Sequence, residues 1–138
     1  PLSAFSDGSF HKVIGDQTGV DVGAAPVIVL CSGKVYYELE DEREKNADLA
    51  SVPLLRLEQI YPFPEAELSA ILADCPDGTE LRWVQEEPEN MGAWRFLRGR
   101  LRDGEMGRFT ITCVARPESA SPATGSGSSH KLEQKCYL

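Results

Sequence analysis

The turn with the clearest chemical potential joins a buried strand to a helix. Residues 27–31 form a short apolar run, and Ser32, Gly33 and Lys34 follow it directly, ahead of a charged helical stretch. In open α/β sheets, ligands bind beyond the carboxyl ends of the strands, where helix amides attract anions. These three residues are therefore candidates for an anion or effector site. A plain strand-to-helix turn is the favoured interpretation, because no fuller glycine fingerprint surrounds them.

A stripe of arginines is the second candidate for binding an anion. Arg95, Arg98 and Arg102 fall at positions i, i+3 and i+7, beside an apolar helix face. Guanidinium groups bind phosphates and carboxylates with paired hydrogen bonds. Arg98 is the residue of the stripe chosen to test for an effector such as coenzyme A. Two alternatives stay open: a solvated helix face, and docking to an acidic protein surface.

A third polar cluster, Gln85-Glu86-Glu87 with Asn90, stands at the end of a predicted strand. Paired carboxylates can perform acid–base catalysis. Neighbouring residues of an extended chain point to opposite faces, however, so Glu86 and Glu87 need not share a site. An interface is the favoured interpretation, with Asn90 also able to cap the helix that follows.

Cysteine and histidine spacing argues against a metal site and against a nucleophilic catalyst. There are 4 cysteines, without a Cys-x-x-Cys pair, and 2 histidines, without a nucleophile motif beside them. Most of the cysteines stand beside apolar residues, which is typical of reduced thiols in a core and indicates a reducing compartment. We predict no catalytic residue, no metal ligand and no cofactor-binding residue. The residues concerned are Cys31, Cys75, Cys113, Cys136, His11 and His130.

Elements that would position these groups alternate along the chain. Apolar strands are predicted over 27–31, 52–58, 81–85 and 109–114, and amphipathic helices between them begin near Lys34, Pro64 and Asn90. This alternation predicts an α/β open sheet, mostly parallel. We expect a lead-in arm over residues 1–25, an α/β core over 26–116 and a C-terminal tail over 117–138.

Composition excludes several classes of protein. The chain has 138 residues, a net charge of -8 and 41% apolar residues, which suits one domain and argues against binding to nucleic acid or anionic lipid. No apolar run approaches the ~20 residues that would span a bilayer. Charge is uneven, with 18 acidic and 6 basic residues over 1–90 against 4 and 8 over 91–138. Because the chain begins with Pro1, we expect a piece of a longer protein.

Four segments together resemble a known family. They are residues 31–38 (CSGKVYYE), 57–64 (LEQIYPFP), 83–94 (WVQEEPENMGAW) and, within 115–134, ARP, SASPATG and HKLEQ. In order and spacing they resemble the C-terminal domain of the thiamine diphosphate-dependent first component of 2-oxoglutarate dehydrogenase. The resemblance covers nearly the whole chain and is weakest at residues 136–138.

The resemblance implies a three-layer, transketolase-like C-terminal domain whose mostly parallel sheet has five strands, one of them antiparallel. It also implies oxidative decarboxylation of 2-oxoglutarate, with succinyl transfer to the lipoyl group of a succinyltransferase component. Thiamine diphosphate and Mg would be bound by upstream domains, so this fragment alone is expected to be inactive. A homodimer, in the bacterial cytoplasm or the mitochondrial matrix, is implied as well.

Within that family the resemblance implies inter-domain or dimer contacts for the polar segment. The residues concerned are Gln85, Glu86, Glu87, Asn90 and Trp94. Tryptophan can anchor an interface, and Gly92 permits close approach of the backbone. The resemblance also implies that part of the tail over residues 117–124 packs in order, where composition alone indicates a flexible linker. Two alternatives stay open: the same domain of a 2-oxoadipate-type dehydrogenase, and a stand-alone α/β module that binds an anion such as coenzyme A.

Overall fold

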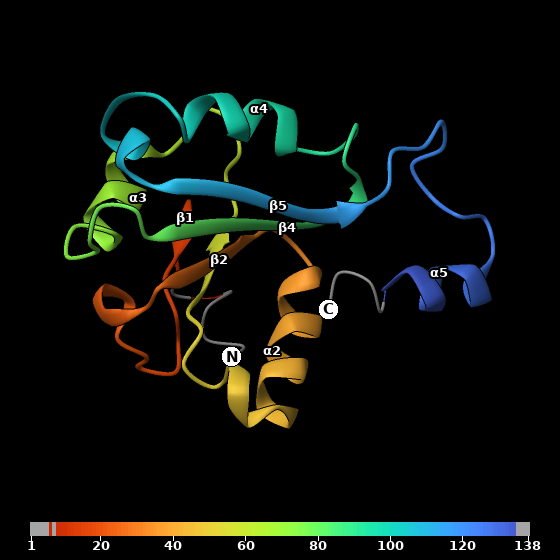
Figure 1. Cartoon of the computed structure of the whole chain (residues 1–138), viewed down its shortest axis with the longest axis horizontal. Coiled ribbons are helices and arrows are strands. Elements are labelled where there is room, and N and C mark those ends of the chain that lie inside the picture. The colour runs from red at the N-terminus through yellow and green to blue at the C-terminus, as the bar shows by residue number, and fades with distance from the viewer. Residues whose placement is uncertain (1–5, 7, 135–138) are drawn as a thin grey trace.

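A single five-stranded sheet forms the centre of the computed structural model, which describes residues 6 and 8–134 (Figure 1). Across the sheet the order is β1-β3-β2-β4-β5. β1 is antiparallel to β3 and the other three pairs are parallel, which confirms the predicted mostly parallel sheet with one antiparallel strand. The strands are β1 (Val13–Ile14), β2 (Val27–Cys31), β3 (Leu54–Leu57), β4 (Glu80–Pro88) and β5 (Thr110–Arg116).

Helices cover both faces of this sheet and complete the three predicted layers (Figure 1). α2 lies on one face, and α3 and α4 lie on the other, while α5 stands beyond the end of β5. The α-helices are α2 (Val35–Lys45), α3 (Glu65–Ile71), α4 (Trp94–Arg100) and α5 (Gly127–Gln134), and the 3-10 helices are η1 (Val22–Ala24), η2 (Ala47–Leu49) and η3 (Gly104–Arg108).

Alternate residues of the central strand β2 enter two separate cores. Ile28 and Leu30 pack with the helices α3 and α4, whereas Val29 and Cys31 pack with α2. A strand covered on both faces must be apolar at every position, since neither set of side chains reaches water. The continuous apolar run over residues 27–31 is explained by this double cover.

The fifth strand comes from the predicted arm. Val13 pairs with Leu57 and Ile14 with Arg56, so β1 is an edge strand of only 2 residues. Two residues are too few for an alternating pattern, and their extended state follows from pairing with β3. The division into arm, core and tail stays a prediction.

The start of α4 differs from the expectation, and the predicted cap by Asn90 is wrong. The N-cap residue is Ala93, without a side-chain hydrogen bond to the helix. Asn90 instead binds the backbone of Ser119, 29 residues away. A partner so distant in the sequence outcompetes local capping here, which sequence pattern alone does not reveal.

The cysteines behave as predicted within the part of the chain that the structure describes. Cys31, Cys75 and Cys113 are free, the first two buried and the third half-buried. Burial raises the pKa of Cys31 and of Cys113 to about 12, so both are protonated thiols at neutral pH. The fourth, Cys136, lies outside the described residues.

Among residues 6 and 8–134, no group of three or more histidine, cysteine or acidic side chains is arranged to hold a metal ion. No helix in this range is both long and apolar enough to cross a membrane.

Candidate functional site at the carboxyl edge of the sheet

β2 and β4 are neighbours, and the chain leaves their carboxyl ends toward opposite faces. From β2 it passes into α2 on one face, and from β4 into α4 on the other. This divergence opens a crevice, the usual position of ligand and contact sites in open α/β sheets. A pocket of about 190 Å³ lies here, and its lining includes Ser32, Gln85, Glu86 and Glu87. The structure therefore brings together two segments that the sequence analysis selected separately.

Gln85 is the organising residue of this edge. Its side chain is 3% exposed, and its Oε1 accepts hydrogen bonds from Trp83 Nε1 at 2.8 Å and from the Trp94 amide at 3.1 Å. Its Nε2 donates to the carbonyls of Pro88 at 3.0 Å and Met91 at 2.8 Å, and more weakly to that of Glu87 at 3.3 Å. The amide is therefore fully satisfied, and it ties the loop between β4 and α4 into one conformation.

Gly92 makes this close packing possible. Its φ is +65°, a backbone conformation that residues other than glycine rarely adopt. A Cβ at this position would lie 2.9 Å from Gln85 Oε1. Both the backbone conformation and the lack of space require glycine. The predicted close approach is thus to a side chain of the same chain.

Gln85 and Trp94 are too buried, at 3% and 5% exposure, to touch another domain themselves. They position the loop, whereas Glu87 is exposed and Glu86 and Asn90 are half-buried. Of the five residues predicted to make contacts, these three present atoms to the outside. Their partner stays a prediction.

Lys34, part of the predicted anion site, is already neutralised. Its Nζ lies 2.8 Å from Glu38 and 2.5 Å from Glu86, and these contacts raise the pKa of Lys34. An incoming anion would have to displace two carboxylates and would meet the exposed Glu87 nearby. Ser32 makes no cap hydrogen bond to α2, whose N-cap is Lys34.

Arg98 lines a different pocket from Ser32. With Arg95, Trp94, Glu89 and Glu118 it lines a hollow of about 330 Å³. Arg95 lies 3.5 Å from Glu118, whereas the Arg98 side chain is exposed and has no hydrogen bond or ion pair with any described residue. Arg102 follows the end of α4 and does not line this hollow. The two candidate anion sites are therefore separate in the structure, and binding at each of them stays a prediction.

Two hydrogen bonds between the Asn90 side chain and the Ser119 backbone hold the tail against this edge of the sheet. Asn90 Nδ2 donates to the Ser119 carbonyl at 2.9 Å, and the Ser119 amide donates to Asn90 Oδ1 at 3.1 Å. This pair mimics a strand pairing and holds the tail beside the loop.

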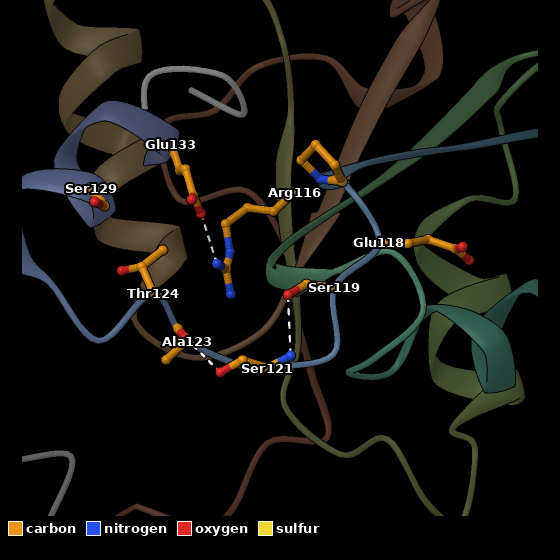
Figure 2. A pocket seen from close by; sticks show the side chains of 9 residues that line it. Arg116, Glu118, Ser119, Ser121, Ala123, Thr124, Ser129 and Glu133 are labelled. Carbon is orange, nitrogen blue, oxygen red and sulfur yellow. Dashed lines mark hydrogen bonds and ion pairs between the residues drawn. The ribbon is translucent and has the colours of Figure 1, made fainter.

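Arg116 holds the tail at a further point (Figure 2). It is 7% exposed and donates to the carbonyls of Glu86 and Pro122. It also donates to the Glu133 carboxylate on α5, the contact drawn in Figure 2. Around it the tail encloses a hollow of about 530 Å³, lined mainly by hydroxyl groups and two carboxylates. Because Nε, Nη1 and Nη2 of Arg116 each bind a protein partner, its guanidinium group is not free to bind a ligand in this hollow.

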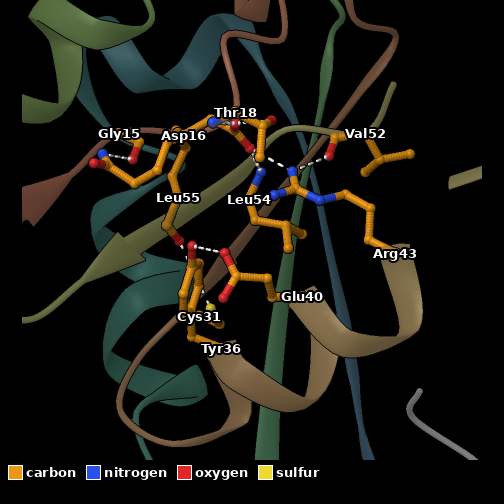
Figure 3. Close-up of polar contacts among 11 residues, drawn as sticks. Gly15, Asp16, Thr18, Cys31, Tyr36, Glu40, Arg43, Val52, Leu54 and Leu55 are labelled. Carbon is orange, nitrogen blue, oxygen red and sulfur yellow. Dashed lines mark hydrogen bonds and ion pairs between the residues drawn. The ribbon is translucent and has the colours of Figure 1, made fainter. Parts of the chain in front are cut away.

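A buried ion pair on the α2 side of the sheet is not among the residues predicted from the sequence (Figure 3). Asp16 and Arg43, with side chains 2% and 6% exposed, lie 2.5 Å apart. Asp16 also accepts from the amides of Leu54 and Thr18, both at 2.8 Å. Arg43 follows Val35 and Leu39 at intervals of four, so helix periodicity placed it on the buried side and could have found it.

Comparison with known proteins identifies the family of the chain. All of residues 1–138 match the family described as 2-oxoglutarate dehydrogenase C-terminal. A relative from Shouchella clausii named 2-oxoglutarate dehydrogenase E1 component is 41% identical over 137 residues, 98% of this chain and 14% of that protein. A relative of the same name from Cupriavidus necator is 38% identical over 138 residues, 100% of this chain and 14% of that protein. Oxoglutarate dehydrogenase from Buchnera aphidicola is 42% identical over 134 residues, 97% of this chain and 14% of that protein. The chain belongs to the 2-oxoglutarate dehydrogenase C-terminal family.

Proposed function

We propose that this chain is the C-terminal domain of a 2-oxoglutarate dehydrogenase E1 component. The observation that carries the proposal is the family match over all of residues 1–138, with relatives at 35–42% identity that bear that enzyme's name. The activity proposed for the whole protein is oxidative decarboxylation of 2-oxoglutarate, with transfer of the succinyl group to a lipoyl group. That group belongs to a separate succinyltransferase component.

Thiamine diphosphate and Mg, which this activity requires, do not fit the residues described here. No cluster of three metal-ligating side chains exists among them, and Lys34 and Arg116 already bind carboxylates. The unpaired Arg98 does not suffice, because the diphosphate is bound together with a divalent cation, which needs a group of oxygen ligands. We therefore assign both groups to the upstream part of the protein and derive no step from them here.

The function we propose for the domain itself is docking against upstream domains of the same chain within a homodimer. Its contact surface would be the end of β4 and the loop that follows it, with Glu86, Glu87 and Asn90. The supporting observation is that a buried amide, Gln85, is committed wholly to holding this loop rigid. A surface ordered before contact loses less conformational entropy when it binds.

The test is an assay of the complete protein that contains this chain. It is expected to release carbon dioxide from 2-oxoglutarate only when thiamine diphosphate is present, and to lose that activity when residues 1–138 are deleted. Rates with 2-oxoadipate distinguish the alternative substrate, which is longer by one methylene group. Absence of activity with any 2-oxo acid would refute the assignment.

A second candidate function is favoured by one observation, the unpaired Arg98 beside Trp94 in a hollow of about 330 Å³. We propose that this hollow binds an anionic effector such as acetyl-CoA, independently of Ser32, Gly33 and Lys34. Calorimetry with acetyl-CoA should give heat with the wild type and little with Arg98→Ala. Arg102→Ala is the control, since Arg102 lies outside the hollow. Equal heats from all three proteins would remove the proposal.

For the compartment we propose a reducing one, the bacterial cytoplasm or the mitochondrial matrix. Three free cysteines, two of them buried, support it.

A further inference from the structure

Two tyrosines of this chain are strongly exposed and yet each is packed edge-on against another aromatic ring. Tyr61, 75% exposed, lies with its ring centroid 6.1 Å from that of Phe96, at an interplanar angle of 66°. Tyr37, 61% exposed, lies 5.3 Å from Tyr36 on α2. The two pairs lie on opposite sides of the sheet, Phe96 with α4 and Tyr36 with α2. They differ in the charged side chains around them.

A cationic side chain without a partner lies against the first pair. The Cζ atom of Arg100, one helical turn after Phe96, lies 5.5 Å from the Phe96 ring centroid. Arg100 has no carboxylate partner among the described residues, although the chain carries a net charge of -8. Tyr37, in contrast, stands on the acidic helix α2, beside Arg56, which already has Glu58 at 3.8 Å.

The first pair also adjoins the carboxyl edge of the sheet. Ile60, the neighbour of Tyr61, lines the pocket there together with Ala93, which precedes α4. Ile60, Phe63 and Phe96 all pack on the main core, so the exposed Tyr61 ring rests on a rigid base. Large aromatic rings on a rigid base, flanked by arginine, are typical of the residues that dominate the energy of protein interfaces.

We propose that Tyr61, Phe96 and Arg100 form the anchor by which this domain docks onto the upstream part of its own protein. The docked surface would supply an apolar side chain to the Tyr61 ring and a carboxylate to Arg100. Charge complementarity supports an acidic surface, because the unpaired Arg100 lies beside the Phe96 ring. The relatives offer ample chain for it, since this domain is only 14% of their length. This inference rests on the docking proposed above and adds a contact outside the surface of Glu86, Glu87 and Asn90.

Hydroxyl-radical footprinting read by mass spectrometry tests the anchor, with Tyr37 as an internal control. It compares the isolated chain with the complete protein. In the isolated chain Tyr61 and Tyr37 should be oxidised at similar rates. In the complete protein oxidation of Tyr61 should fall about tenfold, because a hot-spot ring is desolvated, while that of Tyr37 stays unchanged. Equal oxidation of Tyr61 in both proteins would overturn the proposal.

Two substitutions separate charge from packing in the complete protein. Arg100→Glu should restore oxidation of Tyr61, whereas Arg100→Lys, which keeps the charge, should leave it protected. Protection that survives Arg100→Glu would refute the acidic partner. The circular dichroism spectrum of the isolated chain checks that each variant folds.

The outcome is independent of the reaction assigned to the whole protein. Tyr61 protected in a protein without 2-oxo acid activity would keep the anchor and reject the enzyme. Tyr61 exposed in an active enzyme would do the reverse.

Discussion

Two buried polar clusters lie on opposite faces of the sheet and are built in opposite ways. Gln85, on the α4 side, is neutral, and its side-chain oxygen and nitrogen are both satisfied by hydrogen bonds. Asp16 and Arg43, on the α2 side, are charged, and the buried Nη2 atom of Arg43 has no hydrogen-bond partner among the described residues. The first cluster orders one loop, whereas the second ties the N-terminal segment to α2 and β3.

The difference lies in what happens when one member is removed. Losing a neutral partner exposes donors and acceptors that water can partly satisfy. Losing one charge of a buried pair leaves the other without compensation in a medium that solvates it poorly. We therefore expect the charged cluster to matter most for stability and the neutral one most for the shape of the contact surface.

Asp16→Ala should produce the largest loss of stability. It leaves Arg43 buried with only the Val52 carbonyl, and it removes the acceptor of the Leu54 amide. Breaking a buried pair in this way costs about 3–5 kcal/mol, measurable as the free energy of unfolding in urea. Asp41→Ala is the control, because its ion pair with Lys45 is exposed to water and contributes little to stability. Equal losses of unfolding free energy in the two variants would show that the buried pair contributes no more to stability than the exposed pair.

Gln85→Ala should cost less, about 2–4 kcal/mol, because several groups lose a hydrogen bond but none is charged. The chain has 2 tryptophans, and both Trp83 and Trp94 bond to Gln85, so their fluorescence reports this cluster alone. We expect a red-shifted emission at temperatures where the far-ultraviolet circular dichroism is still native. Gln59→Ala, which removes an exposed hydrogen bond to the Pro62 carbonyl, should leave the emission unchanged. An unchanged spectrum in Gln85→Ala would refute the organising function.

Much of this architecture follows from local pattern, because burial imposes it residue by residue. The strand over residues 27–31 was predictable since both of its faces are covered. Gln85 could have been placed in the interior, as it continues the inward alternation of Leu81 and Trp83 along β4. Its hydrogen-bonding partners could not, because they depend on how the following loop folds back.

Arg43 and Asn90 show the two reasons why the remainder was missed. Arg43 stands in the helical repeat of the buried side, but its charge suggested solvent, and its partner Asp16 is 27 residues away. Asn90 has the side chain of a helix cap, but Ser119 binds it from a distance. In both cases a long-range partner decided the position of a polar side chain. No pattern within a short window contains that partner.

Gly92→Ala tests the neutral cluster by placing a methyl group against the Gln85 side chain. A Cβ at a φ of +65° and 2.9 Å from Gln85 Oε1 should cost about 1–3 kcal/mol through strain and displacement of the amide. Gly99→Ala is a control of opposite sign, since it lies within α4 and a methyl group there would have nothing within 4 Å of it. Alanine there should stabilise the chain by about 0.5–1 kcal/mol. Thermal unfolding of the two variants measures both, and a destabilised Gly99→Ala with a neutral Gly92→Ala would reverse the argument.

Acid titration gives the smallest of the expected effects and the one that separates the clusters by charge. Burial pushes the pKa of Asp16 upward, but hydrogen bonds from the Leu54 amide, Thr18 and Arg43 outweigh it, and the pKa lies below its usual value. The contribution of Asp16 is therefore complete above the pKa of an unfolded aspartate. It is lost as the pH falls through the lower pKa of the folded state.

Asp16→Asn should flatten that acid limb, because an amide has no proton to gain in this range. The free energy of unfolding, measured from about pH 6 to pH 2, should fall less steeply in Asp16→Asn than in the wild type. Gln85→Ala should lower the whole curve without changing its slope, since no titrating group is removed. Parallel curves for the wild type and Asp16→Asn would mean that the buried carboxylate does not control acid stability. The contrast between a charged and a neutral cluster would then reduce to their hydrogen bonds.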